Sequence, residues 1–144
     1  SLLRPERVVM LESDTKLDAL NELINCLGAC PEVSDSDALA KEIFHRESLM
    51  STGIGFNVAV PHARIACVSD LVLAIGIAGS DIVDYVSLDE QPIRIVCMVA
   101  ARPDQHAHYL KTLSAVSETM KPEPVRRALL DAKDARAAYL ILTQ

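Results

Sequence analysis

Residues 71–78 read LVLAIGIA, an almost uninterrupted apolar run. A second run of the same kind, IRIVCMVA, covers residues 93–100. A continuous apolar run of this length is typical of a β-strand buried on both faces, because a strand with one face in water alternates apolar and polar residues. The two runs therefore predict two buried strands of one sheet.

Shorter patterns on the N-terminal side of these runs predict two helices. Apolar residues recur at helical spacing from Leu17 to Leu27, after capping residues and before Gly28, which suits a helix end. A second stretch of capping residues, followed by apolar residues at helical spacing, comes next and predicts the second helix. The elements expected here are a strand at residues 8–11, a helix at 16–27, a second helix running to about residue 48, a glycine-rich turn at 52–56 and a strand at 57–60 ended by Pro61.

The C-terminal half continues the alternation of helices and strands. Residues 81–91 are acidic and irregular, with a short edge strand expected near Tyr85. Pro103 predicts the entry of a helix, and residues 125–130 predict a short one. Residues 134–142 fit either a helix capped by Asp134 or a strand. The pattern as a whole predicts an α/β fold: a single-domain sandwich over residues 1–144 with a mixed, mostly buried β-sheet flanked by helices.

Composition excludes several classes of protein. The chain of 144 residues has a formal net charge of −6 and no cluster of Lys and Arg, which disfavours nucleic acid as a partner. No apolar run approaches the roughly 18 to 20 residues of a membrane span, and no secretory signal opens the chain, so we expect a cytoplasmic protein without direct membrane insertion. No His, Cys or Asp cluster has zinc spacing, and we expect neither a metal nor a cofactor.

His62 is the residue best suited to carry chemistry. A neutral imidazole nitrogen is a nucleophile near pH 7, and the phosphoramidate that it forms still transfers its phosphoryl group readily. Such a site needs an acceptor for the other ring nitrogen, donors around the phosphoryl oxygens and access for a partner. His62 follows a predicted strand and Pro61, which fixes the backbone there. Taken alone, a histidine after a strand is more often a structural or surface residue.

The segments around His62 form a longer motif. Arg46 and Glu47 precede GIG at residues 53–55, and VAVPHAR follows at residues 58–64. This arrangement closely resembles the enzyme IIA domain of the fructose/mannitol class of the bacterial sugar phosphotransferase system, a group that includes the stand-alone nitrogen-regulatory IIA proteins. The resemblance covers nearly the whole chain. It implies a phosphotransferase component that works through a phosphohistidine intermediate.

The resemblance also implies roles for individual residues. His62 would be the phosphoryl acceptor, and Arg46 the cation that orients and neutralises the phosphoryl group. Many members of the family have a second histidine near the start of a late helix, for which His106 and His108 compete here. The spacing H-x-x-x-L-x-x-L favours His106. Arg64 would either hold phosphate or face solvent.

Three hypotheses follow for the function. In the first, the chain takes a phosphoryl group from HPr, or from a nitrogen-branch HPr-like protein, and passes it to a IIB domain. In the second, it is a regulatory IIA protein that binds target proteins according to its phosphorylation state. In the third, it is a purely structural α/β domain, which requires that His62 be unreachable or far from Arg46.

Overall fold

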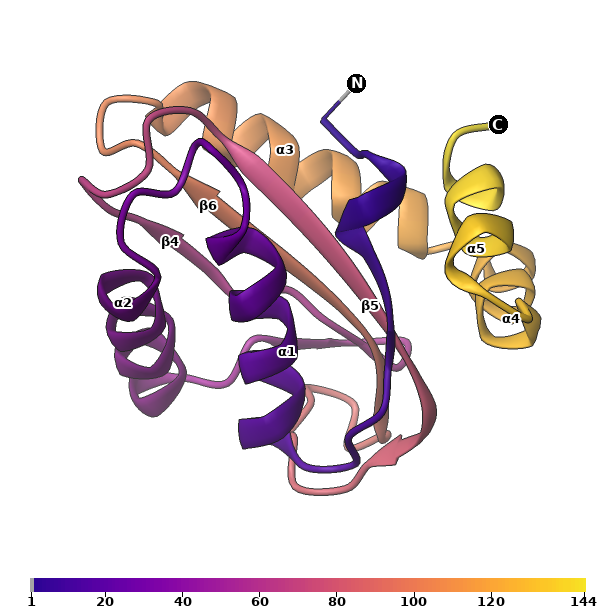
Figure 1. Ribbon diagram of the computed structural model, residues 1–144. Coiled ribbons are helices and arrows are strands. Elements are labelled where there is room, and N and C mark those ends of the chain that lie inside the picture. Colours follow the sequence, from indigo (N-terminus) through magenta and orange to yellow (C-terminus); the bar gives the residue numbers. More distant parts are fainter. Residues whose placement is uncertain (1) are drawn as a thin grey trace.

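The computed structural model describes residues 2–144 and contains one mixed β-sheet between two layers of helices (Figure 1). The strands are β1 (Val8–Leu11), β2 (Gly53–Gly55), β3 (Val58–Ala59), β4 (His62–Arg64), β5 (Val72–Ile82) and β6 (Ile93–Ala101). The helices are the 3-10 helix η1 (Pro5–Arg7) and the α-helices α1 (Lys16–Gly28), α2 (Ser36–Leu49), α3 (His106–Met120), α4 (Glu123–Asp131) and α5 (Ala135–Leu142). The predicted fold class is confirmed.

The two apolar runs form the centre of the sheet. They are β5 and β6, which pair in antiparallel register with Ile75 opposite Cys97. Strand β1 extends the sheet in parallel beside β5. On its other side, β6 pairs in parallel with β3 and then, further along, with β4. The order β1-β5-β6-β3-β2 leaves the central pair buried almost throughout, as expected for continuous apolar runs.

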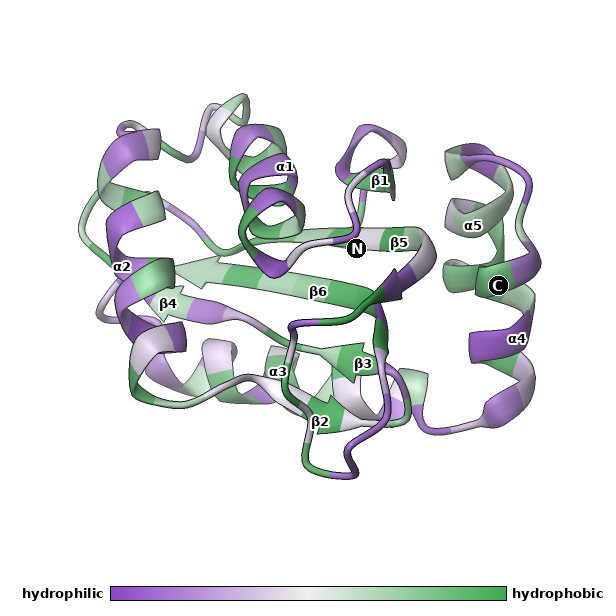
Figure 2. Ribbon diagram, turned by 90° about the horizontal axis from the view of Figure 1, so that it is seen from below, coloured by the Kyte–Doolittle hydropathy of each residue, from purple (hydrophilic) through white to green (hydrophobic). Residues whose placement is uncertain are grey.

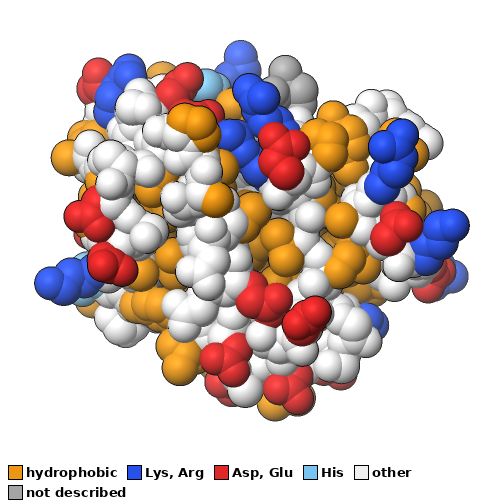
Figure 3. All heavy atoms as spheres, viewed as in Figure 1, with side chains coloured by type: hydrophobic (Ala, Val, Ile, Leu, Met, Phe, Trp, Pro, Cys, Tyr) orange, Lys and Arg blue, Asp and Glu red, His pale blue; other side chains and the backbone are white. Residues whose placement is uncertain are grey.

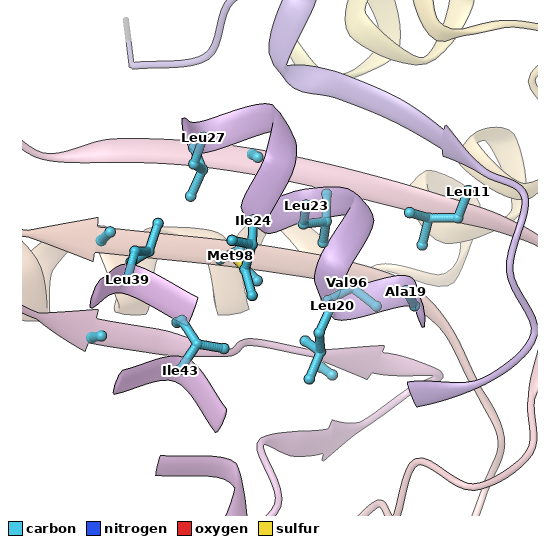
Figure 4. Packing of buried hydrophobic residues seen from close by; sticks show 14 of the residues in the cluster. Leu11, Ala19, Leu20, Leu23, Ile24, Leu27, Leu39, Ile43, Val96 and Met98 are labelled. Carbon is cyan, nitrogen blue, oxygen red and sulfur yellow. The ribbon is translucent and has the colours of Figure 1, made fainter. Parts of the chain in front are cut away.

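Each face of the sheet has its own apolar core. Helices α1 and α2 cover one face, where Leu20, Leu23 and Ile24 of α1 pack toward Val96 and Met98 of β6 (Figure 4). Helices α3, α4 and α5 form the second layer, and their apolar side chains pack with Ile75, Ile95 and other residues that point to the opposite face. Figure 2 shows the apolar colour along β5 and β6 between these layers. Burial of apolar area on both faces stabilises the sandwich.

The expected glycine turn at residues 52–56 is wrong. Residues 53–55 form strand β2, and the turn lies one step later, at Phe56 and Asn57, which both have positive φ (58° and 66°). Gly53 is needed for a different reason: a Cβ there would lie 2.3 Å from the carbonyl oxygen of Val86. The glycine therefore permits the close approach of another segment rather than a reversal of the chain.

Three smaller expectations also change. No strand forms at Tyr85, although Ser87 makes an isolated bridge to Gly53. Helix α3 begins at His106 rather than at Pro103, because the turn that contains Pro103 is closed by the Gln105 side chain, which accepts a hydrogen bond from the Arg102 backbone N–H. The C-terminal segment is the helix α5, and Asp134 caps it by accepting a hydrogen bond from the backbone of Ala137 at 2.8 Å.

Acidic side chains gather along one edge of the molecule. Figure 3 shows them at the lower edge of the α1 and α2 side, where the β1–α1 and β5–β6 connections lie in Figure 1. The exposed acidic residues of these two connections are Glu12, Asp14, Asp84, Asp89 and Glu90. Their charge accounts for much of the net charge of −6, which opposes binding of a polyanion at this edge.

Candidate functional site

His62 is the first residue of β4, beside the C-terminal part of β6. Strand β3 ends at Ala59, and Pro61 separates it from β4, so His62 opens a new short strand rather than following the end of one. It lies opposite Val99, whose backbone N–H donates to the carbonyl oxygen of Pro61 at 3.0 Å. The backbone on both sides of His62 is therefore fixed by the sheet.

A backbone carbonyl fixes the tautomer of the His62 ring. The distance between Nδ1 of His62 and the carbonyl oxygen of Val60 is 2.6 Å. Because a carbonyl oxygen only accepts hydrogen bonds, Nδ1 carries the proton. The lone pair of the neutral ring is then on Nε2, the only ring nitrogen left to act as a nucleophile.

His62 and Arg46 line the same groove. The groove has a volume of about 440 Å³ and runs between the C-terminal end of α2, the β2–β3 region and α3. Arg46 is half-exposed at its rim, and its Nε donates to Glu42 at 3.2 Å. The other residues along the groove are Leu49, Met50, Ser51, Thr52, Gly53, Ile54, Val60, Leu88, Leu113 and Ser117. The site is thus mostly apolar, with one guanidinium and one imidazole in it.

Glu47 fixes the position of the segment around Thr52, which lines this groove. Its side chain is buried and pairs with Lys16 Nζ at 3.0 Å. It also accepts hydrogen bonds from the backbone N–H of Thr52, at 3.3 Å, and from the Thr52 hydroxyl. The hydroxyl of Tyr85 completes the network, 2.8 Å from that of Thr52. Glu47 therefore ties the end of α2 to the start of α1 and to the segment that enters β2.

Tyr109 of α3 lies directly beside the imidazole. The centroids of the two rings are 5.7 Å apart, with a tilt of 58° between their planes. Arg64 shares this corner: its Nη1 donates to the carbonyl oxygen of Pro103 at 3.1 Å, and its guanidinium lies 5.7 Å from the centre of the Tyr109 ring. Arg64 therefore lies against the tyrosine, and its predicted role in holding phosphate stays a prediction.

Neither predicted second histidine lines the His62 groove. His106 is the exposed first residue of α3, one turn before Tyr109 on the same side of the helix. His108 lines a different groove of about 390 Å³, with Lys111 and Thr112. Spacing on the sequence could have found Tyr109, because it follows His106 by three residues and therefore shares its helix face. Glu47 was part of the quoted motif, but nothing in the sequence showed that it is buried.

The arrangement supplies a positioned nucleophile, a cation and an open approach. His62 is only partly buried and shares its groove with Arg46, so the condition for a purely structural domain is not met. Within residues 2–144, no three side chains of His, Cys, Asp or Glu are grouped as metal ligands would be. None of the helices in that range combines the length and apolarity needed to cross a bilayer.

The sequence matches a family described as "Phosphoenolpyruvate-dependent sugar phosphotransferase system, EIIA 2" over residues 1–144. It is 37% identical over 134 residues to the PTS system fructose-specific EIIABC component of Bacillus subtilis. The alignment covers 93% of this chain and 21% of that protein, so the chain spans about a fifth of the length of this relative.

Two solved structures have the same fold. The nitrogen regulatory protein IIA-Ntr from Neisseria meningitidis superposes with a TM-score of 0.88 and 23% identity, and the match covers 98% of this chain and 96% of that one. The second is the complex of enzyme IIAMTL and phosphorylated enzyme IIBMTL from Escherichia coli, with a TM-score of 0.82, 18% identity, and coverage of 98% and 96%.

Proposed function

Because the chain belongs to the EIIA 2 family of the phosphoenolpyruvate-dependent sugar phosphotransferase system, we propose that it carries a phosphoryl group on Nε2 of His62. The observation that carries this proposal is the 2.6 Å contact between Nδ1 of His62 and the Val60 carbonyl oxygen. It leaves Nε2 unprotonated in the neutral ring, in a groove that Arg46 also lines. The chain is a component of a phosphoryl-transfer system, and His62 is its acceptor.

The chemistry is a transfer between nitrogen atoms. The lone pair of His62 Nε2 attacks the phosphorus of a phosphohistidine on the donor protein, the donor N–P bond breaks, and its electron pair returns to the donor imidazole. The His62 ring gains positive charge as the new N–P bond forms, and the Val60 carbonyl stabilises the Nδ1–H of that ring. In the second step the phosphoryl group leaves for a nucleophile on the acceptor, and the His62 ring returns to its neutral form.

Positively charged side chains supply most of the catalytic effect. A transferring phosphoryl group keeps its charge on the equatorial oxygens, and guanidinium groups bind such oxygens well. Arg46 is the phosphate-binding cation in this proposal, and it exchanges its contact with Glu42 for one with the phosphoryl group. Arg64, which lies 5.7 Å from the centre of the Tyr109 ring, adds positive charge at longer range.

The partners follow from the relatives. We infer that the donor is HPr, or an HPr-like protein of the nitrogen branch. A solved structure of similar fold holds a IIA protein against phosphorylated IIB, which supports a IIB domain as the acceptor. We further propose that residues 1–144 form one IIA domain and that it works in the cytoplasm, where these partners reside.

The direct test is phosphorylation by phosphoenolpyruvate, enzyme I and HPr. We expect the wild-type chain to be labelled and the His62→Ala variant to stay unlabelled, while His108→Ala, which changes the other groove, is labelled at the wild-type rate. Labelling of His62→Ala as fast as the wild type would remove His62 from the mechanism.

A regulatory role is the second candidate. The fold superposes best, among the structures described above, on a nitrogen regulatory protein, at a TM-score of 0.88. In that role the phosphorylation state of His62 controls which protein binds at the groove. A binding experiment with His62→Ala and His62→Asp separates the two roles: a set of bound proteins that differs between them supports regulation, and identical sets contradict it.

A further inference from the structure

Tyr109 has a hydroxyl without a protein partner at the edge of the proposed phosphoryl site. The ring is buried, with 6% of the residue exposed, and packs beside His62 with its centroid 5.7 Å from that of the imidazole. No side chain or backbone group within residues 2–144 forms a hydrogen bond with the hydroxyl. By contrast, the hydroxyl of the equally buried Tyr85 is bonded to Thr52. The hydroxyl oxygen itself is not fully buried, so a ligand can reach it.

The charges of two arginines act on this hydroxyl. Burial raises the pKa of Tyr109 to about 12, while the positive charges of Arg46 and Arg64 pull the pKa in the opposite direction. The hydroxyl therefore stays protonated throughout the physiological range, and the guanidinium of Arg64 lies 5.7 Å from the centre of its ring. A neutral O–H donor in a positively charged surrounding offers a hydrogen bond without adding negative charge, which is what an incoming phosphoryl group requires.

We propose that Tyr109 is a phosphoryl-binding residue, whose hydroxyl donates a hydrogen bond to a phosphoryl oxygen on His62 Nε2 and whose ring holds the imidazole in place. This inference rests on the proposed function. It assigns to Tyr109 the supporting role that the sequence pattern gave to His106 or His108. Because the donor is a tyrosine, it does not titrate between pH 5 and 9, where a histidine would gain or lose its charge.

The substitution Tyr109→Phe separates this role from packing, because phenylalanine keeps the ring against His62 and removes only the hydroxyl. Tyr139→Phe is the matched control: it deletes a hydroxyl from α5, which packs near β1 and α4. Each protein is phosphorylated with phosphoramidate, a small donor that needs no docking surface, and separately with HPr. The rate of labelling of His62 and the ³¹P resonance of the product are measured.

We expect Tyr109→Phe to be labelled about tenfold more slowly by both donors, since a hydrogen bond to a charged group is lost. Its ³¹P resonance should move, and Tyr139→Phe should match the wild type in both readouts. Wild-type rates together with an unchanged ³¹P resonance in Tyr109→Phe would overturn the role of Tyr109 alone. Absence of label on His62 in the wild type would instead contradict the proposed function.

Discussion

Two grooves flank helix α3, and each contains a histidine. The His62 groove has a volume of about 440 Å³ and the His108 groove about 390 Å³, so size does not distinguish them. His62 comes from a strand, and its Nδ1 is held by the Val60 carbonyl. His108 comes from the first turn of α3, is exposed, and has no side-chain hydrogen bond to any described residue.

The charged neighbours of the two histidines also differ. Arg46 lines the groove with His62, and its half-exposed guanidinium pairs with Glu42 at 3.2 Å. Near His108, the pKa of Asp70 lies below its ordinary value, chiefly because Gln105 donates to its carboxylate and with smaller effects from the charges of Arg102 and His108. Lys111 also lines the His108 groove, and Glu42 pairs with Arg46, so the sign of the nearby charges does not by itself separate the two grooves. The clearer difference is the tautomer of His62, which the Val60 carbonyl fixes.

The substitution of Arg46 takes the guanidinium out of the His62 groove. For Arg46→Ala we expect phosphorylation of His62 to slow by about 10- to 100-fold, because a charge-assisted hydrogen bond to the transferring group is lost at a half-exposed position. Labelling kinetics with HPr measure the effect. Arg127→Ala, which removes an exposed arginine on α4, serves as the control and should leave the rate unchanged. Equal rates for the two variants would contradict the role of Arg46.

Removing the charge of Glu47 should slow phosphoryl transfer less than Arg46→Ala does, but it should clearly lower the stability of the fold. Glu47→Gln leaves Lys16 without its buried partner, and we expect the free energy of unfolding to fall by about 2 to 4 kcal/mol. Urea denaturation measures the change. Glu118→Gln breaks an exposed pair with Lys121 and should change stability by less than about 1 kcal/mol. Similar losses in both variants would show that the Glu47 network does not fix the segment around Thr52.

The smallest expected effect is on stability and comes from the turn at Phe56 and Asn57, after β2. Asp89 accepts hydrogen bonds from the backbone N–H groups of Phe56 and Gln91, at 2.9 and 3.1 Å, and these lower the pKa of its carboxyl. A depressed pKa in the folded state means that the stabilisation is present above the unfolded value of about 3.9 and is lost as the pH falls through the folded pKa. Asp89→Asn should therefore melt below the wild type at pH 7.

The pH series provides the control for that variant. The melting temperatures of Asp89→Asn and the wild type should begin to converge below the unfolded value of about 3.9 and should meet once the pH has passed the lower folded pKa, because only then is the folded wild-type carboxyl neutral as well. A gap that stays constant over the whole series would mean that the charge of Asp89 plays no part in the turn.

The sheet could be predicted from the sequence because its central strands are continuous apolar runs. Such a run is typical of a strand buried on both faces, whichever helices pack on it. The position of the turn could not be predicted. Gly53 is needed because the backbone of Val86 lies against it, and Val86 is distant in the sequence. The C-terminal segment fits either a helix or a strand because residues 139–142 form a short continuous apolar run, which suits both, and the structure has a helix capped by Asp134.

The site was predictable in its centre and less so at its edge. The motif singled out His62 and Arg46, which the structure brings to one groove. The choice between His106 and His108 depended on the face of a helix relative to a distant strand, and the ring beside His62 is that of Tyr109 instead. Local spacing places residues on a helix face, but only the packing of α3 on the sheet decides which of them meets the imidazole.

Long-range ¹H–¹⁵N NMR of the histidine rings, before and after phosphorylation by HPr, tests the central claim most directly. The unphosphorylated protein should show His62 protonated at Nδ1. The phosphorylated protein should show the phosphoryl group on Nε2 of His62, with Nδ1 still protonated and the rings of His106 and His108 unmodified. A phosphoryl group on Nδ1 of His62, or on either histidine of α3, would contradict the account.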